Sequence, residues 1–168
     1  KKNGLLETAN NSVANISFEY DKVGRTIKES MGMTGFSTHE VTSTYDVQNK
    51  VNAITYPSGD SYSFSFDERG RLEHVEEGVN ELVGWTYGPT DLADTKVYKH
   101  MGAPISTTDY DFSDFSELES LKHTFNNASS SLDYNYTFDA IGNKLQEELV
   151  HQPNFSSTYT YDDRGQLW

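Results

Sequence analysis

Cysteine is absent from all 168 residues, so the chain can form no disulfide, no thiolate nucleophile and no cysteine-ligated metal site. No apolar run approaches the ~20 residues that a membrane-spanning helix needs. Basic residues are also few, since 13 Lys and Arg stand against 26 Asp and Glu and give a formal net charge of −13. A surface this acidic repels nucleic acid and anionic lipid, so we expect neither nucleic-acid binding nor membrane insertion.

Signatures of catalysis are missing as well. The five histidines are at least 23 residues apart and form no metal-binding pair such as His-Glu-x-x-His. Serine nucleophile elbows, Walker loops and dinucleotide-binding glycine motifs do not occur. The sequence therefore predicts a protein that is not an enzyme and needs no cofactor, with hydrolysis as the least favoured alternative.

Aromatic residues are abundant: the chain has eleven Tyr, nine Phe and two Trp within a hydrophobic content of only 35%. Tyr and Phe favour a pleated, half-buried surface, and they occur here with frequent Ser, Thr and Gly. Good helix formers are sparse. The composition thus predicts an all-β protein.

A short motif recurs along the chain, in which an aromatic residue precedes Asp and Gly follows three residues later. Four copies are complete, at Tyr20-Asp21-Gly24, Phe66-Asp67-Gly70, Phe138-Asp139-Gly142 and Tyr161-Asp162-Gly165. A fifth has Tyr45 and Asp46 but places Asn49 at the Gly position, and Asn is the commonest substitute for Gly at positive φ. The motif predicts a repeat protein.

Two weaker copies fill the gaps between the clear ones. One places Tyr87 before Gly88, with Asp91 following, and the other places Tyr110 and Asp111, with Asp114 at the Gly position. The aromatic anchors then lie at residues 20, 45, 66, 87, 110, 138 and 161, with intervals of 21 to 28 residues. We therefore expect residues 1–168 to form a single array of about seven units.

Each unit has a direct physical interpretation. Before the anchors, apolar residues lie two apart, as in Tyr62, Phe64 and Phe66, which is typical of a strand with one buried face. The anchor Asp can accept backbone N–H groups in a tight turn, and Gly or Asn supplies the left-handed residue that reverses the chain. The predicted turn residues are Asp21, Gly24, Asp46, Asn49, Asp67, Gly70, Asp139, Gly142, Asp162 and Gly165. Tandem hairpins of this kind predict a meandering antiparallel sheet that curls as its strands twist.

One segment fits two interpretations. Residues 113–125 contain Phe115, Leu118, Leu121 and Phe125 at near-helical spacing, with Ser113 as a candidate cap. We expect either a strand or a short helix there.

Two sets of residues are candidates for binding. Asp109, Asp111 and Asp114 form a local acidic cluster that is a weak Ca²⁺ candidate, although the order of residues in an EF-hand loop is missing. Trp85, Tyr87, Tyr56 and Trp168 could stack against a glycan, but their regular placement favours a role in packing the sheet face.

The recurring motif resembles the YD repeat of the RHS family, and "FDERGRL" at residues 66–72 and "YDKVGRT" at residues 20–26 are close matches. This family includes bacterial polymorphic toxins, the C component of insecticidal toxin complexes, wall-associated proteins and teneurins. The resemblance implies a spiralling β-sheet that wraps into a hollow shell, which in the toxins encloses a C-terminal toxic polypeptide. It is weakest in the central units, and the family's Asp-based self-cleavage segment has no match here.

Taken with a chain that begins on Lys1 rather than Met, the resemblance predicts a fragment of a longer, secreted or cell-surface protein. Its expected function is structural, as a piece of shell wall whose partners are the rest of the shell and an enclosed C-terminal polypeptide. A carbohydrate-binding or protein-binding module is the alternative. Unpaired edge strands would also favour self-association.

Overall fold

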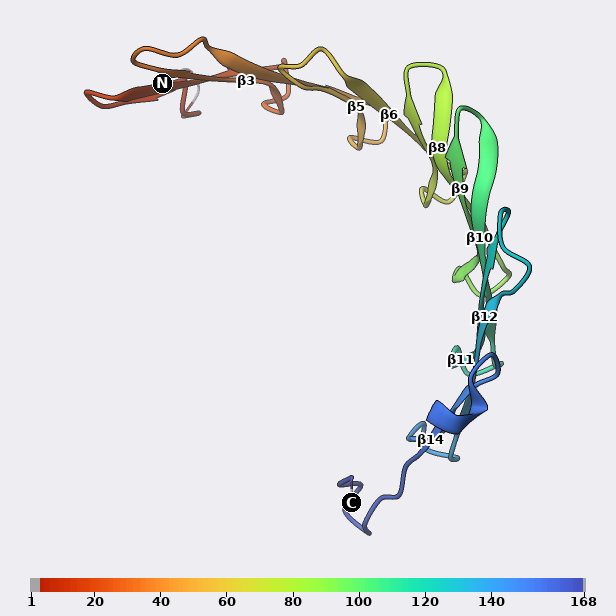
Figure 1. Cartoon of the computed structure of the whole chain (residues 1–168). Coiled ribbons are helices and arrows are strands. Elements are labelled where there is room, and N and C mark those ends of the chain that lie inside the picture. The colour runs from red at the N-terminus through yellow and green to blue at the C-terminus, as the bar shows by residue number, and fades with distance from the viewer. Residues whose placement is uncertain (1–3, 168) are drawn as a thin grey trace. The chain divides into compact units, whose positions relative to one another are not determined.

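The computed structural model describes residues 4–167 and consists almost wholly of antiparallel β-strands (Figure 1). The predicted all-β fold is therefore confirmed. The chain divides into two compact units, Lys1–Asn80 and Glu81–Trp168. Within residues 4–167, no helix has the length and apolar character required to cross a membrane.

The first unit is a meander in which each strand pairs with the next along the chain. Its strands are β1 (Thr8–Asn10), β2 (Ala14–Tyr20), β3 (Thr26–Met33), β4 (His39–Tyr45), β5 (Val51–Thr55), β6 (Ser61–Phe66) and β7 (Leu72–Glu77).

The second unit has the same up-and-down topology. Its elements are β8 (Asn80–Tyr87), β9 (Ala93–His100), β10 (Ala103–Phe112), β11 (Leu118–Phe125), β12 (Leu132–Phe138), β13 (Lys144–Leu149), the 3-10 helix η1 (Pro153–Phe155) and β14 (Ser157–Thr158). Beyond β14, Tyr161 and Leu167 form an isolated antiparallel bridge.

Aromatic side chains two residues apart share a face of the sheet, as the period-two pattern predicts. The rings of Phe18 and Tyr20 stack at 6.5 Å between centroids, and those of Tyr110 and Phe112 stack at 6.4 Å. The sheet faces are only partly covered, and no hydrophobic side chain among residues 4–167 is fully buried. The two units therefore lack the closed core that a two-layer domain would have.

A β-bulge marks the end of the first strand in six of the hairpins. In the first hairpin Tyr20 pairs with Thr26 but Glu19 pairs with Lys28, so the returning strand carries one extra residue. The same shift occurs immediately before Tyr45, Phe66, Tyr87, Phe112 and Phe138. Because a bulge bends the strand and re-aims a side chain, it places each anchor ring in the same relation to its turn.

Residues 113–125 contain no helix, so the helical alternative for this segment is wrong. Residues 113–117 form a turn, and Leu118–Phe125 is strand β11, paired with both β10 and β12. Pairing on two sides satisfies the backbone groups of β11, which outweighs a helical spacing of only a few apolar residues.

Candidate functional site

The repeated turns are the candidate functional site, and the Asp67 turn illustrates their geometry. The Asp67 N–H donates to the Arg71 carbonyl at 2.9 Å, and the Gly70 N–H donates to the Asp67 carbonyl at 2.8 Å. One carboxylate oxygen, Asp67 Oδ1, accepts the backbone N–H groups of Arg69 at 3.0 Å and Arg71 at 2.9 Å. The other, Oδ2, accepts Arg71 Nε at 2.7 Å. One side chain thus holds both the turn and the start of the returning strand.

Asp21, Asp46, Asp139 and Asp162 make the same two Oδ1 contacts with the backbone N–H groups two and four residues later, at 2.8 to 3.0 Å. Asp21 also accepts Arg25 Nε at 2.5 Å, and Asp139 accepts Asn143 Nδ2 at 2.9 Å. Equivalent contacts in successive hairpins give the carboxylates a turn-capping geometry rather than the paired arrangement that acid–base catalysis requires.

Hydrogen bonding lowers the pKa of three of these carboxyl groups. Partial burial raises the pKa of Asp67, but the backbone N–H and guanidinium of Arg71 outweigh this effect and hold it below the usual 3.8. The same balance applies to the pKa of Asp21, where Arg25 supplies the donors. For Asp139, the side-chain amide of Asn143 is the largest cause of the lowered pKa. These carboxylates are therefore stabilised as anions.

Two turns of the same shape begin without Asp. Gly88 starts one, with its N–H donating to the Leu92 carbonyl at 3.1 Å, and here Tyr87 is the anchor as predicted. Ser113 starts the other, and its hydroxyl Oγ replaces the carboxylate by accepting the N–H groups of Phe115 and Glu117, both at 3.2 Å.

The anchor predicted at Tyr110 is two residues away from the position found in the structure. Tyr110 and Asp111 lie within β10, and the residue before the turn is Phe112. The left-handed residue is Ser116, with φ 66°, rather than Asp114. Asp111 lacks a turn role because strand pairing continues past it to Phe112, and the hydroxyl of the next residue, Ser113, caps the turn in its place.

Positive φ occurs at the fourth residue of all seven turns, which the motif assigned to Gly or Asn. Asn49 has φ 66° and Gly70 has φ 79°, while Asp91 and Ser116, both at 66°, take this conformation in the turns that begin with Gly88 and Ser113. Asn and Asp tolerate this region better than most residues do because their side chains can bond locally.

Basic side chains connect one turn to the next within the first unit. Arg25 Nη1 donates to Asn49 Oδ1 of the following turn at 2.8 Å, and its guanidinium carbon lies 4.5 Å from the centre of the Tyr45 ring. Lys50 repeats this arrangement one hairpin later: its ammonium donates to the Gly70 carbonyl and lies 4.6 Å from the centre of the Phe66 ring. Each cation therefore bonds to the next turn and stacks on the next anchor.

Anchor tyrosines make a second connection between hairpins. The Tyr45 hydroxyl donates to the Thr26 carbonyl at 2.8 Å, and the Tyr161 hydroxyl donates to the Lys144 carbonyl at 2.8 Å. Thr26 and Lys144 hold the same position, five residues after the Asp of the preceding turn. The aromatic-Asp-Gly motif predicts neither connection, although the basic residues at 25, 50 and 71, each four after a motif Asp, are a visible signal for the first.

The glycan candidates lie on different elements. Trp85 and Tyr87 lie on β8, whereas Tyr56 begins a turn in the first unit, and Trp168 lies outside the described residues. The Lys96 ammonium lies 5.3 Å from the centre of the Trp85 ring, which partly occupies the ring face that a sugar would need.

The acidic Ca²⁺ candidates are likewise not arranged as ligands. Asp109 and Asp111 project from β10 and Asp114 from the adjacent turn, all exposed. Across residues 4–167, no three carboxylate or imidazole side chains are grouped so that they could hold a metal ion.

Comparison with known proteins agrees with the geometry of the repeats. The family model for the teneurin YD-shell matches residues 1–80. No curated protein matches the chain.

Three solved structures share the fold over nearly the whole chain. A crystal structure of TcdB2-TccC3-Cdc42 has a TM-score of 0.75 at 16% identity and covers 96% of this chain. TcdB2-TccC3 without its hypervariable C-terminal region gives 0.74 at 16% over 96%, and the Photorhabdus luminescens Tc holotoxin pore gives 0.71 at 18% over 95%. The chain spans only 9% of each of these structures. The resemblance to RHS/YD-repeat proteins is thus confirmed: residues 1–80 match the teneurin YD-shell family, and the chain has the fold of a segment of these toxin-complex proteins.

Proposed function

We propose that the chain is a non-enzymatic segment of a YD-repeat shell wall, which in the complete protein encloses a C-terminal polypeptide. The observation that carries the proposal is the meander of capped hairpins, in which a carboxylate closes each motif turn and, in the first unit, stacked cations connect one turn to the next. An array that depends on contacts between neighbouring repeats extends by adding units, and so suits a wall.

Half-covered sheet faces support the same proposal. Large apolar side chains on the strands, such as Met31, Met33 and Tyr98, remain 41%, 40% and 38% exposed. Exposed apolar area on this scale is typical of surfaces that meet another protein surface. An enclosed polypeptide, or further turns of the shell, would cover it.

Protease protection in the complete protein tests the proposal. In the wild type, the polypeptide that follows the shell should resist trypsin under conditions that digest it when it is made alone. Asp67→Ala combined with Asp139→Ala removes two turn caps and should expose the polypeptide to cleavage. Equal cleavage of the polypeptide alone and within the intact protein would contradict enclosure.

The same proposal includes secretion or display at the cell surface. It also predicts that the isolated chain self-associates. Strand β1 pairs with β2 on one side only among the described residues, and an unpaired edge is a template for another strand. Sedimentation should show dimers or larger species at micromolar concentration. A strictly monomeric profile would contradict an open edge.

A binding module remains a second candidate because of one surface hollow in the first unit. Tyr56, Tyr62 and Phe64 line a hollow of about 690 Å³, and the two tyrosine rings meet edge to face at 5.9 Å. Exposed aromatic rings stack on sugars or apolar side chains. Glycan binding that Tyr56→Ala abolishes and Trp85→Ala spares would support this function, whereas no binding by the wild type would exclude it.

A further inference from the structure

Counting the capping Asp or Ser as the first residue of a turn, the fifth residue contacts the fourth residue of the next turn in several hairpins. Arg25 bonds to Asn49, and Lys50 bonds to the carbonyl of Gly70. Leu5 Cδ1 occupies the corresponding place beside Gly24, 3.6 Å from where a Cβ on that glycine would lie. This position therefore places one side chain between neighbouring turns.

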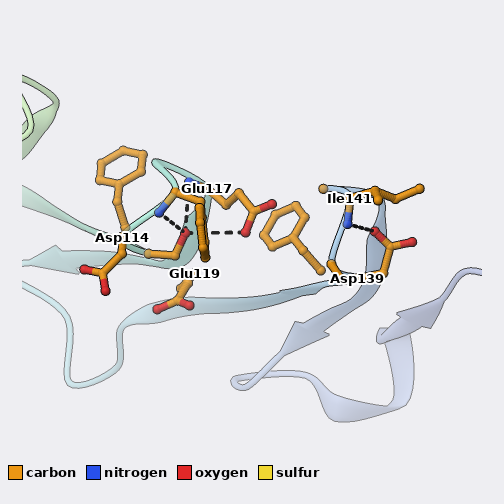
Figure 2. Close-up of a pocket in the computed structure, with 11 residues that line it drawn as sticks. Asp114, Glu117, Glu119, Asp139 and Ile141 are labelled. Carbon is orange, nitrogen blue, oxygen red and sulfur yellow. Dashed lines mark hydrogen bonds between the residues drawn. The ribbon is translucent and has the colours of Figure 1, made fainter.

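Glu117 holds the same position in the Ser113 turn of the second unit. Its Oε1 lies 3.2 Å from where a Cβ on Gly142 would be, so it approaches the next turn as Lys50 approaches Gly70. Figure 2 shows the Glu117 carboxylate directed toward the turn that contains Asp139 and Ile141. A carboxylate thus stands where the first unit places a guanidinium or an ammonium.

A hollow of about 760 Å³ surrounds this carboxylate. Phe112, Phe115 and Phe138 contribute aromatic lining, and Asp114, Glu119 and Asp139 add three further carboxylates. No basic side chain lines the hollow, and none within residues 4–167 forms an ion pair with Glu117 or Glu119. The Ser113 hydroxyl donates weakly to Glu117 Oε2 at 3.4 Å, which leaves Oε1 available.

We propose that this hollow binds an arginine side chain of a partner polypeptide, whose guanidinium lies against the Glu117 carboxylate and the aromatic lining, so that a cation again stands at the junction between two turns. Carboxylates and the electron-rich faces of aromatic rings both attract a cation, and a guanidinium can bond to the one while it stacks on the other. The equivalent junctions at Arg25 and Lys50 are completed by a cation from the chain itself. The Glu117 junction takes its cation from a partner.

The lining favours a side chain on a polypeptide over a bare metal ion. The acidic groups of residues 4–167 are nowhere grouped in the threes that a metal site would need. Phe115 and Ile141, at the rim, are 86% and 83% exposed and can contact the apolar neighbours of a bound arginine. The net charge of −13 also favours a basic partner. This binding does not require that the shell enclose a toxin.

Calorimetric titration of the 168-residue chain tests the proposal with two blocked peptides, Gly-Leu-Arg-Leu-Gly and the same peptide with citrulline, which is neutral and nearly isosteric, in place of arginine. The arginine peptide should bind at least about tenfold more tightly, because a charge-assisted hydrogen bond contributes more than a neutral one. Equal affinities, or no binding of the arginine peptide at millimolar concentration, would overturn the proposal.

Three variants locate the site. Glu117→Gln should weaken binding of the arginine peptide by about tenfold, since it removes the charge from the hydrogen-bonded pair. Glu68→Gln, which removes one exposed charge from a turn of the first unit, should leave the affinity unchanged. Glu117→Arg should abolish binding, because its own guanidinium fills the hollow as Arg25 does. An unchanged affinity in Glu117→Arg would place the peptide elsewhere and contradict the proposal.

Discussion

At the scale of single residues, one acceptor oxygen organises each capped turn. Oδ1 of Asp67 accepts two backbone N–H groups where the chain reverses. Ser113 does the same with a hydroxyl. The requirement is therefore for an acceptor at this position rather than for a negative charge.

Replacement of Asp67 separates the acceptor from the charge. Asp67→Asn can keep the Oδ1 hydrogen bonds and lose only the ionic part of the contact with Arg71, whereas Asp67→Ala loses both. We expect Asp67→Ala to lower Tm by several degrees and Asp67→Asn to lower it by clearly less, as measured by thermal circular dichroism. Equal losses would show that the charge, and not the acceptor, stabilises the turn.

The lowered pKa values of Asp21, Asp67 and Asp139 predict a specific acid dependence. The unfolded chain binds protons at these groups near pH 3.8, before the folded chain does, so their contribution is fully present above that value and is lost as the pH falls through the lower folded pKa. Denaturant titrations should therefore show a free energy of unfolding that decreases below pH 4. Asp67→Asn should reduce this decrease, and an identical acid profile in the variant would contradict the assignment.

At Gly88 a substitution can add a turn cap instead of removing one. It starts a turn without a capping side chain, its φ is not positive, and a Cβ there would meet no atom within 4 Å. Gly88→Asp should stabilise the fold by about 1 kcal/mol, through a less flexible unfolded chain and a new acceptor for the turn. Gly70→Ala, at φ 79°, should instead destabilise the fold. Urea denaturation of both variants checks the contrast, and a destabilised Gly88→Asp would contradict it.

At the scale of the hairpin, the anchor rings of Tyr45 and Phe66 contact a cation from the preceding hairpin. Arg25 bridges the gap by bonding to Asn49 and stacking on Tyr45. Adjacent hairpins are thereby coupled through side chains as well as through the strand ladder. Such nearest-neighbour coupling is what allows a repeat array to behave as one body.

A double-mutant cycle measures this coupling. Arg25→Ala and Tyr45→Leu should each destabilise the fold, and the double variant should lose less than the sum, with a coupling energy of about 0.5–1 kcal/mol for a partly exposed cation–π pair. Tyr45→Phe keeps the ring and removes only the hydroxyl bond to Thr26, so Arg25→Ala should cost as much in that background as in the wild type. Strict additivity in the Leu cycle would contradict the coupling.

Local sequence pattern predicted the strands and five of the turns because each depends on residues close together in the chain, as in Tyr62, Phe64, Phe66 and Asp67. The pattern placed the fifth anchor at Tyr110 instead of Phe112. Two pairs of an aromatic and a polar residue follow each other there, Tyr110-Asp111 and Phe112-Ser113, and only the first contains the Asp of the motif. The connections made by Arg25, Lys50 and Glu117 lay beyond local pattern because they join turns about 25 residues apart.

At the scale of the whole molecule, neither unit has a fully buried apolar side chain among the described residues. Within each of the two units the strands pair with their neighbours along the chain, and apolar side chains on the sheet faces stay partly exposed. A wall segment meets this condition through the rest of its shell and the polypeptide within it. A freestanding binding module would need a core of its own.

Cryo-electron microscopy of the complete protein tests this central claim most directly. We predict that residues 4–167 form part of the wall of a closed shell, with successive turns stacked in register and with density for a polypeptide inside. A structure in which these residues form an isolated open sheet, or in which the shell is empty with the C-terminal polypeptide folded outside it, would contradict the account.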